Sequence, residues 1–530
     1  MEVIKETHQV VNQVPPLERI NAYQDDLPLR ECLQSLNGNP LLESVNVYGG
    51  KIAQLEQLGI QANTYLPRCI THDRYGFRID SVEYHPSYHA LMHEATNIGI
   101  HCLPWLQSSK QGHLARLALE YIHMQVEAGS GCPLSMTYAG IPLLQKNEIV
   151  AKTWLPKALI SNYDGSNAPL EKKACLTLGM AMTEKQGGSD VKANTTRAEN
   201  QNGYYELVGH KWFCSAPMSD GFFVTGQSKE GLSCFLVPRW RPDGSKNPMQ
   251  LVRLKNKLGN QANASSEVEF RGAFGWLIGE PGKGIQTIIE MVALTRFDCM
   301  VGSTAIQRGA WVHARHHAEH RKTFGKRLIE QPLMRNVLAH TALEIEANLQ
   351  TCSHLATLLD ENDPNDHRMR LLTALGKYWI CKNTPLIVVE LLECLGGAGF
   401  VEDFSLARFY REAPLNAIWE GCGNIQCLDI LRTLQKEPEA LAQFMGDIDK
   451  IPQLKSAANS LNKSLKNAEE SQARRLVERL MRLYQSAILF QKAPLWLAEA
   501  FFRQNQDATH LLGTLEEKYV IDALLKRAWS

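Results

Sequence analysis

Apolar residues recur at three- and four-residue spacing through most of the first 156 positions and again from position 285 towards the C-terminus. This period predicts amphipathic helices, and the clearest N-terminal example covers 114–129 (LARLALEYIHMQVEAG). The strongest stretches in the second half cover 285–320, 333–360, 369–394 and 424–435. The pattern therefore predicts two helical regions with something different between them.

Between the two helical regions the pattern changes to alternation of apolar and polar residues. Short alternating segments cover 204–213, 221–227, 232–238 and 265–270, and Gly, Asn and Asp bound them. Such segments predict an antiparallel sheet or a small barrel. We therefore expect an α+β protein in four parts: a helical N-terminal domain at 1–170, a central antiparallel β domain at 171–280, a C-terminal helical bundle at 281–440 and a helical extension at 441–530.

Composition narrows the class of protein. No window approaches 18 consecutive apolar residues, and the N-terminus lacks the basic start and apolar core of a signal peptide, so we expect a cytoplasmic protein without a membrane span. The thirteen cysteines form no CxxC pair, which speaks against disulfides and a cysteine zinc site. Four histidines share one predicted helix, but no acid pattern of a zinc signature lies nearby, so we expect a packed or solvated helix face and no metal: His313, His316, His317 and His320.

Charge is balanced overall, with 56 basic and 56 acidic residues, but it is uneven along the chain. The stretch 450–503 holds ten basic and four acidic residues, a net charge of +6. An amphipathic helix predicted there carries its arginines on one side and leucines on another. An outward basic stripe could bind the phosphates of double-stranded DNA without reading bases, whereas a salt-bridged bundle helix would touch only protein. The candidate contacts are Lys463, Lys466, Arg474, Arg475, Arg479 and Arg482.

Two glycine-containing segments carry candidate chemistry. In GMAMTEKQGGSD (179–190), Thr183 and Ser189 offer hydroxyls, and the glycines let backbone amides approach a planar ring or a phosphate. An ordinary polar turn has the same composition. In LNAIWEGCGNIQ (415–426), Glu420 lies between a tryptophan and small residues where a helix begins. It is either a general base in an apolar pocket or an acid favoured by the helix dipole.

Together with HKWFCSAP (210–217), RKTFGKRL (321–328) and LECLGGAG (392–399), these segments resemble the acyl-CoA dehydrogenase family of flavoenzymes over residues 90–435. TEKQGGSD, HKWF, TRFD, QPLMR and IWEGCGNI are similar to the AidB type of that family. Members of this type belong to the adaptive response to DNA alkylation and carry a C-terminal helical extension. The resemblance implies the acyl-CoA dehydrogenase fold with FAD between the β domain and the C-terminal helices.

The resemblance also assigns roles. Glu420 would remove the α-proton of an acyl thioester while hydride passes to flavin N5, and Trp212 would lie against the isoalloxazine. Segments 321–324 and 393–397 would reach the flavin of a neighbouring subunit and its adenosine half, in a homotetramer built from two dimers. The implied cofactor contacts are Met180, Met182, Thr183, Gly188, Ser189, Trp212, Phe213, Cys214, Ser215, Arg321, Thr323, Phe324, Glu393, Gly396, Gly397, Ile418, Trp419, Gly421, Cys422, Gly423 and Asn424.

Two departures from the family pattern concern the substrate. The substrate-helix arginine is Arg296, but the position three residues earlier, usually acidic, is Ala293. The connection SKEG between two predicted strands is short where relatives that use CoA have more contacts. We therefore expect weak dehydrogenase activity at most. The resemblance to the AidB type implies a short branched substrate such as isovaleryl-CoA, binding and protection of double-stranded DNA, and deactivation of alkylating agents at the flavin. The alternatives are a metabolic short- or branched-chain dehydrogenase without a DNA role and a flavin-bearing scaffold without chemistry.

Overall fold

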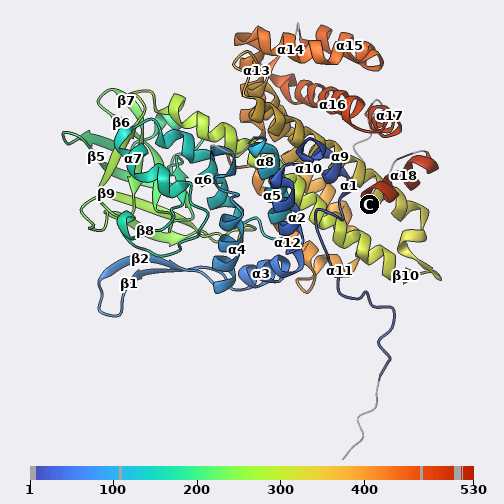
Figure 1. The fold of residues 1–530 in the computed structure, drawn as a ribbon, viewed down its shortest axis with the longest axis horizontal. Helices are drawn as coiled ribbons and strands as arrows, with labels where there is room; N and C mark the ends of the chain where they lie inside the picture. The colour runs from blue at the N-terminus through green and yellow to red at the C-terminus, as the bar shows by residue number, and fades with distance from the viewer. Residues whose placement is uncertain (1–6, 107–109, 466–468, 506–514, 516, 530) are drawn as a thin grey trace, which may run out of the picture.

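The computed structural model describes residues 7–106, 110–465, 469–505, 515 and 517–529. Figure 1 shows a β domain on one side, helices from both halves of the chain on the other, and the C-terminal extension over the helices. The predicted α+β class is confirmed: a β-barrel lies between an N-terminal and a C-terminal helical domain. No helix among the described residues has the length and apolar character needed to cross a bilayer.

The N-terminal domain is helical apart from one hairpin. Strands β1 (Arg68–His72) and β2 (Arg78–Glu83) were missed because the sequence prediction read this region as helical. Their turn is local, since Asp73 Oδ1 accepts the backbone N–H groups of Tyr75 and Phe77, each at 2.9 Å. The helices are α1 (Leu27–Cys32), α2 (Pro40–Gly49), α3 (Ile52–Thr64), α4 (Pro86–Asn97), α5 (Gly112–Met124), α6 (Gly131–Leu144) and α7 (Glu148–Ala158).

The central domain is a closed barrel in which β6, β4, β5, β9 and β7 pair in turn and β7 returns to β6. The predicted small barrel is confirmed and most of its strand pairs are antiparallel, but β3 and β4 both run parallel to β6. For β4 the reason is that β5 reverses the chain between β4 and β6. The strands are β3 (Leu178–Ala181), β4 (Arg197–Asn200), β5 (Tyr205–Ser215), β6 (Gly221–Ser228), β7 (Gly231–Pro238), β8 (Met249–Leu254) and β9 (Ser265–Ile278).

The C-terminal bundle agrees with the predicted helices to within two residues at each end. Its long members are α8 (Gly284–His320), α9 (Pro332–Glu361), α10 (Met369–Glu393) and α13 (Gly423–Lys436). The short helices α11 (Gly397–Phe400) and α12 (Ser405–Glu412) connect α10 to the loop before α13. A two-residue hairpin of β10 (Lys322–Thr323) and β11 (Lys326–Arg327) follows α8.

The extension consists of α14 (Pro438–Asp449), α15 (Lys455–Leu465), α16 (Ala473–Lys492), α17 (Leu495–Gln504) and α18 (Lys518–Trp529). Helix α16 packs on α9, α10 and α13, and its leucines Leu476, Leu480 and Leu483 are buried in the same core as the bundle. The extension is therefore joined to the bundle by hydrophobic packing over the length of α16.

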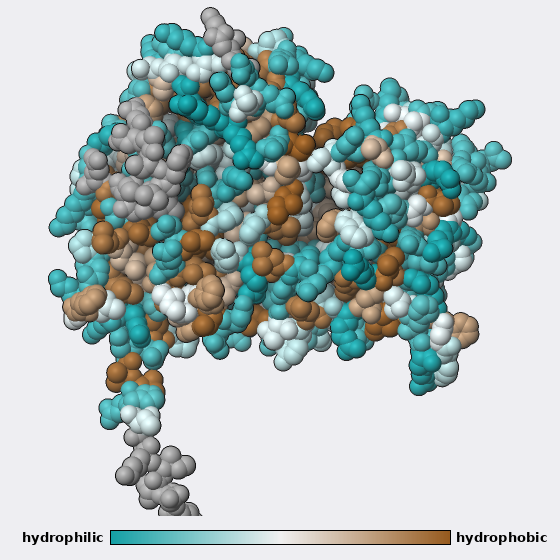
Figure 2. Space-filling view, turned by 180° about the vertical axis from the view of Figure 1, so that it is seen from behind, coloured by the Kyte–Doolittle hydropathy of each residue, from teal (hydrophilic) through white to brown (hydrophobic). Residues whose placement is uncertain are grey.

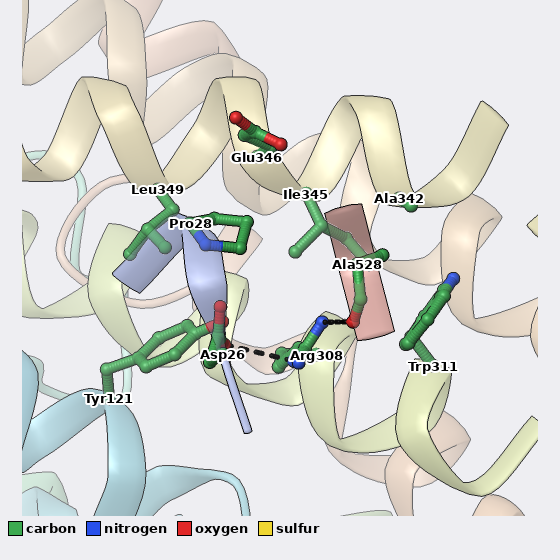
Figure 3. A pocket seen from close by; sticks show the side chains of 10 residues that line it. All are labelled: Asp26, Pro28, Tyr121, Arg308, Trp311, Ala342, Ile345, Glu346, Leu349 and Ala528. Atoms are coloured by element: carbon green, nitrogen blue, oxygen red, sulfur yellow. Dashed lines mark hydrogen bonds and ion pairs between the residues drawn. The ribbon is translucent and has the colours of Figure 1, made fainter. Parts of the chain in front are cut away.

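Helix α18 packs against α9 and against α1, near the start of the chain. Arg308 of α8 binds the Asp26 carboxylate at 3.0 Å and the carbonyl of Ala528 at 3.2 Å (Figure 3). Arg527 pairs with Glu346 of α9 and with Glu31 of α1. The cavity that Figure 3 shows has a volume of only about 10 Å³, room for one water, and none of its lining residues belongs to the predicted site.

Candidate active site

The loop that carries Glu420 has a strained backbone held by side chains from three helices. Glu420 has φ +58° and Gly421 has φ +93°, in the left-handed region. Arg296 of α8 and Gln426 of α13 donate to the Glu420 carbonyl at 3.0 and 3.1 Å. Lys377 of α10 donates to the carbonyls on both sides of Glu420, at 2.8 and 2.6 Å. A non-glycine residue with positive φ costs roughly 1–3 kcal/mol, which these hydrogen bonds offset.

The Glu420 carboxyl group is partly buried and has one hydroxyl partner. Its Oε2 accepts a hydrogen bond from Thr295 Oγ1 at 3.0 Å. Burial raises the pKa of Glu420, and the Thr295 hydrogen bond and the charges of Lys377 and Arg296 oppose that rise. A carboxyl group with a raised pKa is suited to act as a general base near neutral pH.

Arg296, predicted to contact substrate, is turned towards protein groups. Besides the Glu420 carbonyl, it binds the Asp429 carboxylate at 2.9 Å, and Asp429 also binds Arg370. These arginines hold the pKa of Asp429 below its usual range although burial opposes them. In this structure Arg296 supports the loop that carries Glu420, and its contact with substrate stays a prediction.

The polar turn after β3 is fastened to β5. The backbone N–H of Trp212 donates to the Thr183 carbonyl at 2.8 Å. A side chain at Gly188 would place its Cβ 2.4 Å from Thr183 Oγ1, so this position must be a glycine for the hydroxyl to stay where it is. Directly behind the turn, Glu184 and Lys211 form a fully buried ion pair at 2.8 Å, and burial lowers the pKa of Lys211 to about 8.

The four β5 residues predicted to pass the flavin have different surroundings. The Lys255 ammonium lies 3.1 Å from the centroid of the Trp212 ring, so one face of the indole is already covered. Phe213 leaves 47% of its surface exposed. Cys214 is buried in the barrel core, which leaves only its backbone to contact a cofactor, and Ser215 Oγ lies 3.1 Å from Ser265 Oγ.

Apolar packing brings the turn after β3 and the Glu420 loop together. Met180, Met182 and Trp419 belong to one hydrophobic cluster with Leu294 of α8. In Figure 2 the surface is notched between the lobe of the β-barrel and the lobe of the C-terminal helices, with hydrophobic atoms at the base of the notch. The segments around Thr183, Trp212 and Glu420 therefore lie at the junction of barrel and bundle.

The start of α13 offers groups for an anion. Cys422 is its N-cap and accepts no side-chain cap hydrogen bond among the described residues, so the amides of the first turn, Gly423 and Asn424 included, are available. Ile418 and Cys422 are exposed beside it. Ser189 is likewise exposed, in the turn after β3.

The remaining predicted cofactor residues lie elsewhere in the chain. Arg321, Thr323 and Phe324 follow the C-terminal end of α8, 25 residues beyond Arg296, which is roughly 37 Å along a helix. Glu393 ends α10, and Gly396 and Gly397 follow it, so this group begins 16 residues, or roughly 24 Å along the helix, beyond Lys377, which binds the Glu420 loop. One chain therefore does not bring these two groups to Glu420.

The basic residues of the extension divide into two groups. Lys463, Arg474 and Arg475 are exposed, and Lys466 lies outside the described residues. Arg479 binds the hydroxyls of Ser460 and Ser464 in α15.

The outward orientation expected for Arg482 was wrong. This side chain binds the Glu344 carboxylate at 2.7 Å and lies over the Trp379 ring, with its guanidinium carbon 4.5 Å from the centroid. The Glu344 carboxylate on α9 is nearly buried, and the Arg482 guanidinium turns towards it to form the ion pair.

The sequence prediction missed the residues that position the site. They share one property, a polar side chain that is buried or nearly buried beside the loop or the turn: Glu184, Lys211, Thr295, Lys377, Gln426 and Asp429. Lys377 had a visible signal, because it is a single charge in the apolar run LLTALGKYWI. Lysines are rarely buried without a partner, so this position could have been marked as functional.

Comparison with known proteins defines the class first. Residues 179–273 match the family described as acyl-CoA dehydrogenase, middle domain, and residues 282–435 match acyl-CoA dehydrogenase, C-terminal domain. Residues 12–165 match adaptive response protein AidB N-terminal domain. AidB of Escherichia coli (strain K12) is 42% identical over 536 residues, covering 98% of both chains. The chain belongs to the acyl-CoA dehydrogenase family and, within it, to the AidB type.

Two solved structures share this fold over more than nine tenths of the chain. ACDH-11 of Caenorhabditis elegans, in complex with C11-CoA, superposes with a TM-score of 0.86 at 25% identity and covers 98% of this chain and 97% of its own. Bd2924 in its apo-form gives a TM-score of 0.84 at 25% identity, over 91% of this chain and 100% of its own. The three family domains end at residue 435, and both structures align with more of the chain than that. The similarity therefore extends into the C-terminal extension.

FAD is the cofactor of this family, and the residues present fit it. The Thr183 hydroxyl and the free amides of α13 are donors for an anionic, oxygen-rich ligand. A Cβ added at Gly187, Gly396 or Gly397 would meet nothing within 4 Å, so the backbone at these positions is open to a ligand. When bound, the isoalloxazine would accept hydride from the substrate.

Proposed function

We propose that the protein is an FAD-containing member of the AidB type that binds double-stranded DNA through its extension and limits alkylation damage in the cytoplasm. The observation that carries the DNA proposal is the exposure of Lys463, Arg474 and Arg475 on a part of the chain with net charge +6. These side chains lie on helices that are already packed, so they can contact DNA backbone phosphates without further folding of the chain. Deactivation of alkylating agents at the flavin is the chemical role that this family type suggests.

Glu420 is the proposed base for the residual dehydrogenase activity. Its carboxylate would take the α-proton of an acyl thioester, and Thr295 would orient it. Arg296, Lys377 and Gln426 hold the backbone around it, so the carboxylate stays aimed at one position. Trp419 and the methionines of the turn exclude water from that position.

The proposed activity is weak because polar contacts to CoA are few. Ala293 is exposed and has no polar group to offer, three residues before Arg296. The connection between β6 and β7 has only two residues, between Ser228 and Gly231. The substrate proposed is a short branched acyl thioester such as isovaleryl-CoA.

A homotetramer is proposed because the site is incomplete in one chain. Arg321, Thr323 and Phe324 lie too far from Glu420 to share one flavin with it, and Phe324 is fully exposed. A second copy could bring its hairpin to the first copy's cofactor. Isolated monomers should then retain FAD poorly, which dilution followed by flavin fluorescence would measure.

The DNA proposal is tested by fluorescence anisotropy of a labelled 30-base-pair duplex with the FAD-loaded protein at two salt concentrations. Affinity should fall steeply with salt and should fall further when the exposed Lys463 and Arg475 are changed to Gln together. Binding that is absent at low salt, or that ignores both changes, would reject a DNA role.

The second candidate is a metabolic acyl-CoA dehydrogenase whose extension serves assembly. The raised pKa of Glu420 favours it, and the related ACDH-11 structure contains an acyl-CoA. Steady-state turnover with a panel of acyl-CoAs decides between the two. High turnover that is lost in Glu420→Gln, in a protein that does not bind duplex DNA, would replace the first proposal with this one.

A further inference from the structure

One arginine of the extension touches the proposed cofactor segment directly. Arg474, in the first turn of α16, donates from Nε and from Nη2 to Asn424 Oδ1 at 3.0 and 2.7 Å. Asn424 is the second residue of α13, four positions after Glu420. Figure 1 shows α13 and α16 side by side. The basic face of the extension and the start of α13 therefore share a contact.

This contact fixes the orientation of the Asn424 amide. A guanidinium has only donors, so the group that faces Arg474 must be the amide oxygen. The amide NH₂ is then directed away from Arg474 and, because Asn424 belongs to the first turn of α13, it can act as a donor together with the amides of that turn. In this orientation Asn424 adds two N–H groups to a site that suits a pyrophosphate.

We propose that Arg474 couples the two functions: it positions Asn424 for the FAD pyrophosphate, and a DNA phosphate competes for the same guanidinium. A phosphate is charged and binds a guanidinium more strongly than a neutral amide oxygen does. Duplex binding therefore releases Asn424 and weakens the hold on FAD. By linkage, bound FAD weakens duplex binding by the same factor. This inference rests on the proposed DNA binding and on FAD as cofactor.

The test uses the full-length holoprotein and two neighbouring arginines. Arg474→Gln should raise the FAD dissociation constant, measured by recovery of free-flavin fluorescence, by about three- to tenfold. Arg475→Gln removes the same charge from the adjacent exposed position and should retain FAD like the native chain. Both variants should weaken binding of the 30-base-pair duplex.

A double variant separates positioning from a general effect of charge. In an Asn424→Ala background, Arg474→Gln should cause no further loss of FAD, because the oriented amide is already gone. Equal FAD retention in Arg474→Gln and Arg475→Gln, or additive losses in the double variant, would overturn the positioning role.

The coupling itself is measured by titrating duplex into the holoprotein at constant ionic strength, with inorganic phosphate as the second arm. Duplex should raise the FAD dissociation constant several-fold in the native chain and not in Arg474→Gln, and phosphate should do so only at much higher concentration. Duplex that binds tightly without changing FAD affinity would refute the coupling and leave the DNA proposal standing. No duplex binding at all would refute the DNA proposal and the coupling together, while the FAD measurements above still decide whether Arg474 positions Asn424.

Discussion

The Glu420 loop and helix α16 both depend on basic side chains but use them in opposite ways. Around Glu420, Arg296 and Lys377 are nearly buried and bind backbone carbonyls or a carboxylate. On α16, Arg475 is exposed, while Arg482, two turns further along, lies over an aromatic ring and binds Glu344. The difference teaches that a basic residue becomes structural wherever the neighbouring element offers an acceptor, whatever its spacing along the helix.

The largest expected effect is on activity and concerns the proposed base, Glu420. Glu420→Gln removes the proposed base and should lower kcat/KM for isovaleryl-CoA by about 10²–10⁴-fold, the usual contribution of a general base. The measurement is stopped-flow reduction of the flavin by the acyl-CoA. Reduction at the native rate would show that another group takes the proton.

The buried ion pair of Glu184 and Lys211, behind the polar turn after β3, should matter most for stability. Lys211→Met leaves the Glu184 carboxylate buried without its partner and should lower the free energy of unfolding by about 3–5 kcal/mol. Urea unfolding followed by tryptophan fluorescence measures it. The matched control is Arg271→Met, whose pair with Glu269 is exposed and should contribute less than about 1 kcal/mol. Equal effects of the two variants would mean that burial of the pair is unimportant.

Substitutions of two arginines of α16 should have opposite effects, one on stability and the other on DNA binding. Arg482→Met should lower the thermal midpoint, because Glu344 is left buried without its cation, and should leave duplex affinity nearly unchanged. Arg475→Met should weaken duplex binding by about two- to fivefold and leave the thermal midpoint unchanged. Thermal scanning and anisotropy on both variants test this. The reverse assignment would mean that the exposed side of α16 is not the DNA face.

The smallest effect is a change in pH dependence. The Thr295 hydroxyl stabilises the charged form of Glu420, so Thr295→Val should raise the pKa of Glu420 further. A base must be deprotonated to act, so the rate of flavin reduction falls as pH drops through that pKa. The acid limb of the profile should therefore move to higher pH in Thr295→Val, with the plateau at high pH retained. An unmoved limb would show that Thr295 does not govern this carboxyl group.

The sequence alone determined the helices of the bundle, the position of the β domain and the family motifs. Periods of 3.6 and 2 residues report which side of an element faces the core, and this is local information. It was enough to place α8, α9, α10 and α13 within two residues. Glu420 was marked by its motif and the family resemblance, and its role stays a prediction. It was not enough for the hairpin β1–β2 or for the parallel pairing of β4 with β6.

Only the tertiary structure decided which charged groups meet. Arg296 and Asp429 are 133 residues apart in the chain, and Arg482 and Glu344 are 138 apart. A helical period shows that Arg482 lies on a certain side of α16, but only the packing of α16 on α9 places a carboxylate there. The packing of the extension also places Arg474 beside Asn424. The energy of such a contact depends on the distance between the two side chains in space, so the local sequence pattern could not predict it.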